Sequence, residues 1–139
     1  MAALARSLAT LRLFGDDLNP EEVSKLLCAD PTWSARTGDV TPSNSPGGVR
    51  IARTGSWRLQ AAESIPSDVN HQVVEILSQL TPDLDVWRSL VARFDVDLFC
   101  GWFLEKSNEG IFLSPNNLLA LGERGIELDI DIYGSGGDD

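Results

Sequence analysis

The sequence has little positive charge. Its 139 residues contain 11 Lys and Arg against 21 Asp and Glu, which gives a formal net charge of -10 at pH 7. Proteins that bind nucleic acid without sequence preference neutralise phosphates with a basic face. General nucleic-acid binding is therefore not expected, and the same negative charge disfavours contact with anionic membrane surfaces.

Cysteine and histidine are also scarce. Cys28 and Cys100 lie far apart and belong to no CxxC pair, so the sequence contains no disulfide framework and the cytoplasm is the expected compartment. One histidine, His71, cannot complete a zinc site with two distant cysteines, and no nucleophile motif lies near it. We therefore predict no metal, no cofactor and no catalytic residue. No uninterrupted apolar run reaches the ~18 residues that a membrane span requires.

What the sequence does contain is a regular succession of strand and helix patterns. Alternating or continuous apolar residues predict strands at 8–14, 49–53, 56–61, 95–104, 111–113 and 126–132. Capping residues predict helices that start at Asn19, Asp68, the Thr81-Pro82-Asp83 segment and Ser114. In the last helix Leu118 and Leu121 are expected to point inward. Segment 31–48 is rich in Thr, Ser, Asn, Pro and Gly, and it is predicted to be a loop.

This order predicts one α+β domain over residues 1–133. We expect a largely antiparallel sheet with helices packed on one face, built on a ferredoxin-like βαββαβ core with a ββαβ-type extension. Strand 95–104 is apolar on both faces and should be central in the sheet. Residues 134–139 are predicted to form a flexible acidic tail.

Positive charge is concentrated in one part of the chain. Between Thr32 and Ala62 the charged residues are four arginines and one aspartate, which sum to +3, so the remainder carries -10 - 3 = -13. We call this segment, with Trp33 and Trp57, the arginine island; its charged residues are Arg36, Asp39, Arg50, Arg53 and Arg58. Arginine beside an indole can bind carboxylates or phosphates. Alternatively, the island faces the acidic row Glu127, Asp129 and Asp131 across the sheet.

The acidic residues admit simple interpretations. Asp16 and Asp17 precede the first predicted helix, whose N-terminus favours negative charge, and the spacing of an EF-hand is absent. Asp131 belongs to the row that alternates with Ile130 and Ile132 in the last strand. Solvated acids opposite a buried apolar face explain that row.

Several segments together resemble a known family. FGDDLNPEEVSKLLCADP (14–31), RTGD (36–39), SWRL (56–59), DLFCGWFL (97–104) and LSPNNLLALGERGIELDIDIY (113–133) are similar to the bacterial domain-of-unknown-function family numbered 4279. The resemblance implies a small bacterial protein and assigns no catalytic residue. It makes the positions around Asp16, Asp39, Trp57, Trp102 and Asp131 candidates for either fold or site.

Three functions remain open. We expect a non-enzymatic binding protein, an acidic or immunity-type protein that engages a basic protein partner. One alternative is a small-ligand-binding protein, or a hydrolase-like enzyme, for an anionic or carbohydrate-like substrate. There Arg36 and Arg58 would anchor the substrate, and Asp16, Asp17 or Asp131 would act as acid or base. The other is a homodimer. The candidate binding residues are Asp16, Asp17, Arg36, Asp39, Trp57, Arg58, Trp102 and Asp131.

Overall fold

A computed structural model describes residues 5–43 and 45–134 of the chain. The elements, in chain order, are β1 (Arg6–Gly15), α1 (Pro20–Leu27), β2 (Trp33–Ala35), β3 (Val40–Pro42), β4 (Val49–Ile51), β5 (Gly55–Gln60), α2 (Val69–Leu77), α3 (Leu84–Arg93), β6 (Asp95–Phe103), α4 (Pro115–Arg124) and β7 (Glu127–Tyr133).

A five-stranded sheet of order β2-β5-β1-β6-β7 forms the centre of the fold. The four strands β2, β5, β1 and β6 run alternately antiparallel, and α1 and the α2–α3 pair provide the connections. This is a ferredoxin-like βαββαβ core, as expected from the sequence, but its second strand is β2 and not the predicted strand at 49–53. Strand β7 then extends the sheet by pairing parallel to β6 after α4.

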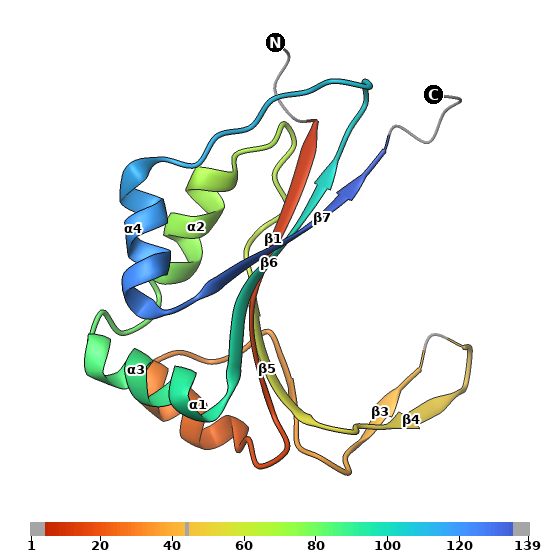
Figure 1. The fold of residues 1–139 in the computed structure, drawn as a ribbon. Helices are drawn as coiled ribbons and strands as arrows, with labels where there is room; N and C mark the ends of the chain where they lie inside the picture. The colour runs from red at the N-terminus through yellow and green to blue at the C-terminus, as the bar shows by residue number, and fades with distance from the viewer. Residues whose placement is uncertain (1–4, 44, 135–139) are drawn as a thin grey trace.

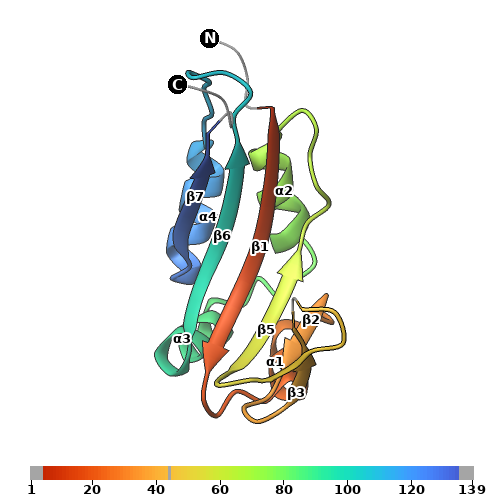
Figure 2. The same ribbon diagram turned by 90° about the vertical axis from the view of Figure 1, so that its right-hand side faces the viewer.

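All four helices cover one face of the sheet, while a hairpin of β3 and β4 projects away from the opposite face (Figures 1 and 2). The mixed helices and mostly antiparallel sheet confirm the α+β class. The core lies between sheet and helices. Its largest fully buried side chains include Trp57 of β5, Trp87 of α3 and Leu98 of β6.

The predicted helix caps are confirmed because they depend on local sequence. Asn19 Oδ1 accepts the backbone N–H of Glu21 at 3.0 Å, and Asp68 Oδ1 accepts that of His71 at 3.0 Å. Ser114 caps α4, and Gly125 ends it with φ of 75°. The third helix starts at Leu84 with Asp83 as its cap, separate from α2.

A buried polar contact fixes α2 on the sheet. Ser7 Oγ donates to Gln72 Oε1 at 2.7 Å, and Gln72 Nε2 donates to the carbonyl oxygens of Ser7 and Ala62, each at 2.9 Å. Both side chains are fully paired in the interior, so this contact sets the position of α2 along β1.

Three sequence predictions about local structure are wrong. Residues 111–113 form no strand. The backbone of this segment is instead bonded to Asn70, whose side chain donates to the Phe112 carbonyl and accepts from the Ser114 N–H. Segment 31–48 contains β2, which pairs with the more distant β5, and β3, which forms a hairpin with the next strand, β4. The strand predicted at 49–53 is confirmed as β4, but it pairs with β3 in a separate sheet and not with the following strand β5. Leu118 is half exposed, whereas Leu121 is buried as predicted.

Among the described residues, no helix is long and apolar enough to cross a membrane. Apart from Gly134, the predicted tail at 134–139 lies outside the described residues.

Candidate functional site

The sheet face opposite the helices, here called the open face, carries a row of charged and aromatic side chains. Cross-strand partners point to the same face of a sheet. The register therefore brings together on this face Arg12, Phe14, Trp33, Arg58, Asp97, Phe99, Glu127, Asp129, Asp131 and Tyr133.

Two arginines lie directly opposite each other at the centre of the open face. Arg12 on β1 is the register partner of Arg58 on β5. Arg12 donates from Nε and Nη2 to the two carboxylate oxygens of Asp97 at 2.8 and 2.6 Å. This bidentate contact raises the pKa of Arg12 above its ordinary value. Arg12 also lies 3.6 Å from Asp129 and over the ring of Phe99, so its charge is balanced.

Arg58 has no such partner. No carboxylate lies within ion-pair distance of it among the described residues, and its Nε is buried without a hydrogen-bond acceptor. Burial, followed by repulsion from Arg12, lowers the pKa of Arg58 below its ordinary value, against a smaller opposing effect of Asp97. Its guanidinium lies 5.2 Å from the centre of the Trp33 ring and 5.6 Å from that of Phe14.

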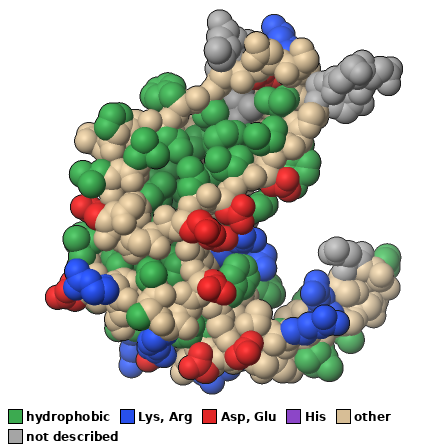
Figure 3. Space-filling model, in the orientation of Figure 1, with side chains coloured by type: hydrophobic (Ala, Val, Ile, Leu, Met, Phe, Trp, Pro, Cys, Tyr) green, Lys and Arg blue, Asp and Glu red, His purple; other side chains and the backbone are tan. Residues whose placement is uncertain are grey.

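A cavity of about 260 Å³, here called the arginine pocket, opens beside Arg58. It lies where the sheet meets the β3–β4 hairpin, and Figure 3 shows the molecule hollowed between these parts. The hairpin adds two further arginines to the lining, which contains no carboxylate. The lining residues are Phe14, Trp33, Thr41, Pro42, Arg50, Ala52, Arg53, Thr54, Ser56 and Arg58.

Local sequence explains how the pocket is held. Gly55 begins β5, and a Cβ atom there would lie 2.8 Å from the Gly15 carbonyl oxygen, so only glycine allows β5 to approach β1. The base of the hairpin is tied by backbone hydrogen bonds of 2.8 Å from Gly38 to Ala52 and from Ala52 to Asp39. These hydrogen bonds hold the hairpin, with Arg50 and Arg53, beside the sheet.

An acidic cluster lies farther along the open face. One carboxylate oxygen from each of Asp97, Glu127 and Asp129 falls within 4.8 Å of the others. The Arg12 guanidinium already balances two of the three groups. Arg12 therefore takes the place of a cation between Asp97 and Asp129, while Glu127 has no ion-pair partner among the described residues.

The pocket contains only one of the candidate residues expected from the sequence, Arg58. Arg36 donates to Glu21 at 2.7 Å, and the carboxylate of Asp39 accepts the Arg36 backbone N–H at 2.8 Å. Asp16 and Asp17 are exposed in the turn before α1. Asp131 lies on β7, three strands from β5. These carboxylates are not part of the pocket lining.

Both tryptophan candidates face the helix side of the sheet. Trp57 is fully buried and donates from Nε1 to Ser24 Oγ at 3.0 Å, so it joins β5 to α1. Trp102 is partly buried against the core, and its Nε1 has no hydrogen-bond partner. Neither side chain therefore lies on the open face or lines the arginine pocket.

The structure also excludes one interpretation of the arginine island, the pairing of its arginines with the acidic row Glu127, Asp129 and Asp131. Strands β1 and β6 separate β5 from the acidic row on β7, and it is Arg12, outside the island, that contacts Asp129. Phe14, Arg50 and Arg53 line the pocket but are not among the candidate site residues predicted from the sequence. The alternation of β1 alone places Arg12 and Phe14 on one face, but only the pairing reveals what they face.

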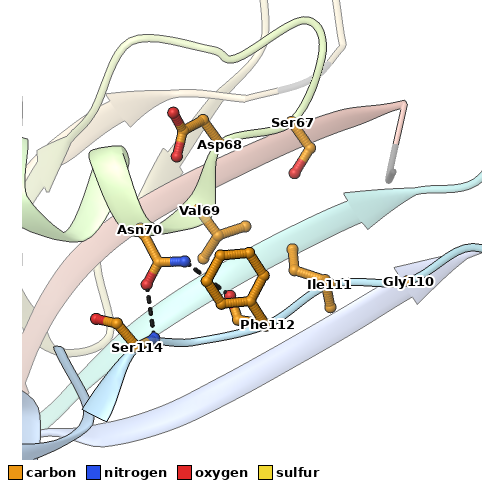
Figure 4. A pocket seen from close by; sticks show the side chains of 8 residues that line it. All are labelled: Ser67, Asp68, Val69, Asn70, Gly110, Ile111, Phe112 and Ser114. Carbon is orange, nitrogen blue, oxygen red and sulfur yellow. Dashed lines mark hydrogen bonds between the residues drawn. The ribbon is translucent and has the colours of Figure 1, made fainter. Parts of the chain in front are cut away.

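A second cavity, of about 280 Å³, lies at the start of α2 and is lined by Ser67, Asp68, Val69, Asn70, Gly110, Ile111, Phe112 and Ser114. Figure 4 shows the amide of Asn70 bonded to both the Phe112 carbonyl and the Ser114 N–H. The Asp68 carboxylate caps the helix. Because these polar groups already have partners, the arginine pocket is the stronger candidate site.

Comparison with known proteins identifies a family for this chain but no individual related protein. No curated protein and no solved structure matches the chain. A family model matches residues 5–135, nearly the whole length, and its description is "Domain of unknown function (DUF4279)". The chain therefore belongs to the DUF4279 family.

Proposed function

We propose that this protein is a non-enzymatic binding protein that holds an anionic group of a small ligand in the arginine pocket. The observation that carries the proposal is Arg58, whose part-buried guanidinium has no carboxylate partner among the described residues and whose Nε lacks an acceptor. A buried donor without a partner destabilises a fold unless a ligand supplies the missing acceptor.

The surroundings of Arg58 favour an anion. Arg50 and Arg53 line the same cavity, and no carboxylate lines it. Carboxylate and phosphate oxygens match the fork of a guanidinium and accept two hydrogen bonds from it. Partial burial strengthens such contacts because water screens them less. Trp33, whose ring centre lies 5.2 Å from the Arg58 guanidinium, also lines the cavity and adds a cation–π contact there.

Binding is favoured over turnover by the composition of the lining. It offers the hydroxyl groups of Thr41, Thr54 and Ser56 but neither a carboxylate nor an imidazole to act as acid or base. The alternative of a hydrolase needed Asp16, Asp17 or Asp131 beside Arg58, and these residues lie outside the lining. The pocket is therefore suited to recognition.

Calorimetric titration with sodium sulfate and with inorganic phosphate tests the proposal. We expect saturable binding that weakens as sodium chloride is added, because chloride screens and competes. Arg58→Met keeps the length of the side chain and removes its charge, and it should weaken binding by about tenfold or more. The matched control is Arg88→Met, which removes an exposed arginine of α3.

The control should bind like the wild type. Equal weakening by both variants would mean that overall charge, not the pocket, attracts the anion. Absence of saturable binding of either anion by the folded wild type would contradict the proposal.

A second candidate function is engagement of a basic protein partner. The net charge of -10 and the carboxylates of Glu127, Asp129 and Asp131 along β7 favour it, because complementary charge speeds and selects association. Affinity purification at low and high salt tests the partner.

We further propose a bacterial cytoplasmic location, in keeping with the free thiols of Cys28 and Cys100.

A further inference from the structure

The last strand leaves one edge of the sheet unpaired. Strand β7 bonds to β6 on one side, and among the described residues no strand pairs with its other side. Figure 2 shows β7 at the margin of the sheet. An unpaired edge presents backbone N–H and C=O groups to which a further extended chain can add. β7 contains neither lysine nor proline, two residues that commonly protect such edges.

The two faces of this edge differ in chemistry. On the open face β7 presents Glu127, Asp129 and Asp131, all exposed. On the helix side Ile130 is 37% exposed and Ile132 is 58% exposed. Figure 3 shows hydrophobic side chains gathered over the upper part of the molecule where α2, α4 and β7 lie. The edge is thus acidic on one face and apolar on the other.

The cations within reach do not neutralise the acidic face. Arg12 is 3.6 Å from Asp129 but makes its bidentate contact with Asp97. Among the described residues Glu127 and Asp131 take part in no ion pair. Negative charge therefore remains along the edge for a partner to meet.

We propose that β7 is a docking edge for an extended segment of a basic partner protein, in which lysine or arginine alternates with apolar residues. Side chains of a strand alternate between faces, so such a segment sets its basic residues beside the carboxylates and its apolar residues beside Ile130 and Ile132. The backbone bonds supply affinity and the alternation supplies selectivity. The docking edge is distinct from the arginine pocket.

A second copy of the chain fits the same edge poorly. Two β7 strands paired antiparallel, with their open faces on the same side, bring the carboxylates of one copy opposite those of the other. Like charges directly opposite destabilise strand pairing. The acidic row thus discourages self-association while leaving the edge open to a chain of opposite charge.

A synthetic peptide tests the docking edge directly. The probe alternates lysine and valine over the length of β7, with blocked termini and a fluorescent label for anisotropy measurements. One control peptide has the same composition with the lysines grouped together. The other is the alternating peptide methylated at every second backbone nitrogen, which removes the donors on one of its edges. Hydrogen exchange of the full chain identifies the backbone groups that the peptide covers.

The variant Asp131→Lys is paired with Asp30→Lys, which makes the same change of charge in the exposed turn between α1 and β2, at the opposite edge of the sheet. We expect Asp131→Lys and each control peptide to weaken binding by about tenfold or more, and Asp30→Lys by about twofold at most. Exchange should slow in β7. Sulfate binding in the arginine pocket should not change in Asp131→Lys.

Other outcomes would overturn the docking edge. If the three peptides bind equally, or if both variants weaken binding equally, the attraction is one of charge alone. If the alternating peptide does not bind, or if it slows exchange only at β2, β7 is not the docking edge. Since sulfate binding is measured separately, none of these results bears on the arginine pocket.

Discussion

Arg12 and Arg58 are register partners on the open face, yet their surroundings are opposite. Arg12 shares two hydrogen bonds with Asp97, whose side chain is only 12% exposed. Arg58 is partly desolvated beside Arg12 and lacks a carboxylate partner in the described part of the chain. The fold therefore stabilises the charged guanidinium of Arg12, whereas the guanidinium of Arg58 lacks a compensating carboxylate among the described residues.

This contrast predicts opposite effects on stability. Asp97→Asn leaves Arg12 without its charged partner and should lower the free energy of unfolding by about 1–3 kcal/mol. Arg58→Met should raise it in sulfate-free buffer, because the lowered pKa of Arg58 means that the fold disfavours its charged form. Urea denaturation at neutral pH measures both. A loss of stability in Arg58→Met under these conditions would show that the arginine supports the fold.

The two cysteines also differ through their surroundings. Burial, aided by the negative charge of Asp97, raises the pKa of Cys100 to about 12, whereas Cys28 is exposed at the end of α1. A thiol of raised pKa stays protonated at neutral pH, and only the thiolate is nucleophilic. We expect a thiol reagent to modify Cys28 in the native protein and Cys100 only after unfolding. Rapid native modification of Cys100 would contradict its burial.

At the scale of elements, the same residue type has different roles in a strand and in a helix. Gly55 lets β5 pass within close reach of the backbone of β1 and of the Leu18 carbonyl. Gly122 lies in α4, where an added Cβ atom would meet nothing within 4 Å. Glycine is therefore required at the first position and costs helix stability at the second.

Alanine at these positions should change stability in opposite directions. Gly122→Ala should raise the free energy of unfolding by about 0.5–1 kcal/mol through helix propensity. Gly55→Ala should lower it, because β5 and its hairpin must move away from β1, and should weaken anion binding in the arginine pocket. Thermal denaturation of the pair provides the comparison. If Gly55→Ala is as stable as the wild type, the close approach of the two strands is incorrect.

For the whole molecule, charge is separated across the sheet. The arginine pocket lies beside β5 and the hairpin, and the uncovered carboxylates lie on β7 at the far edge. This separation allows an anionic ligand and a basic partner to bind without competing for the same surface.

Charge separation also bears on self-association. We predict a monomer of 15.1 kDa at low ionic strength, because the acidic rows repel when two β7 edges meet. Light scattering at micromolar concentration measures the mass. A dimer that persists at low salt would instead support the homodimer interpretation, and hydrogen exchange would then show whether β7 is its interface.

Local sequence was enough for the features that depend on neighbouring residues. The caps at Asn19, Asp68 and Ser114 and the end of α4 at Gly125 follow from contacts within a few residues. The last strand is also where its alternation predicts it, but its apolar side, expected to be buried, is exposed at Ile130 and Ile132 because no element covers it there. The succession of predicted elements led to the expectation of a ferredoxin-like core, although the strand expected second, at 49–53, lies outside that core. The short strand β2 was not predicted because its partner β5 lies far along the chain. The strand β3 was not predicted because it is three residues long and lies in a segment rich in Thr, Ser, Asn, Pro and Gly, although its partner β4 is the next strand.

The candidate site depends on contacts over longer distances. Arg12 and Asp97 are 85 residues apart in sequence, and nothing in either segment indicates that they pair. The charge count marked the arginine island, but it could not show that β1 and β6 lie between the island and the acidic row. Charges are balanced by proximity in space, so the tertiary structure alone distinguishes Arg58, which lacks a carboxylate partner in the described part of the chain, from Arg12, which has one.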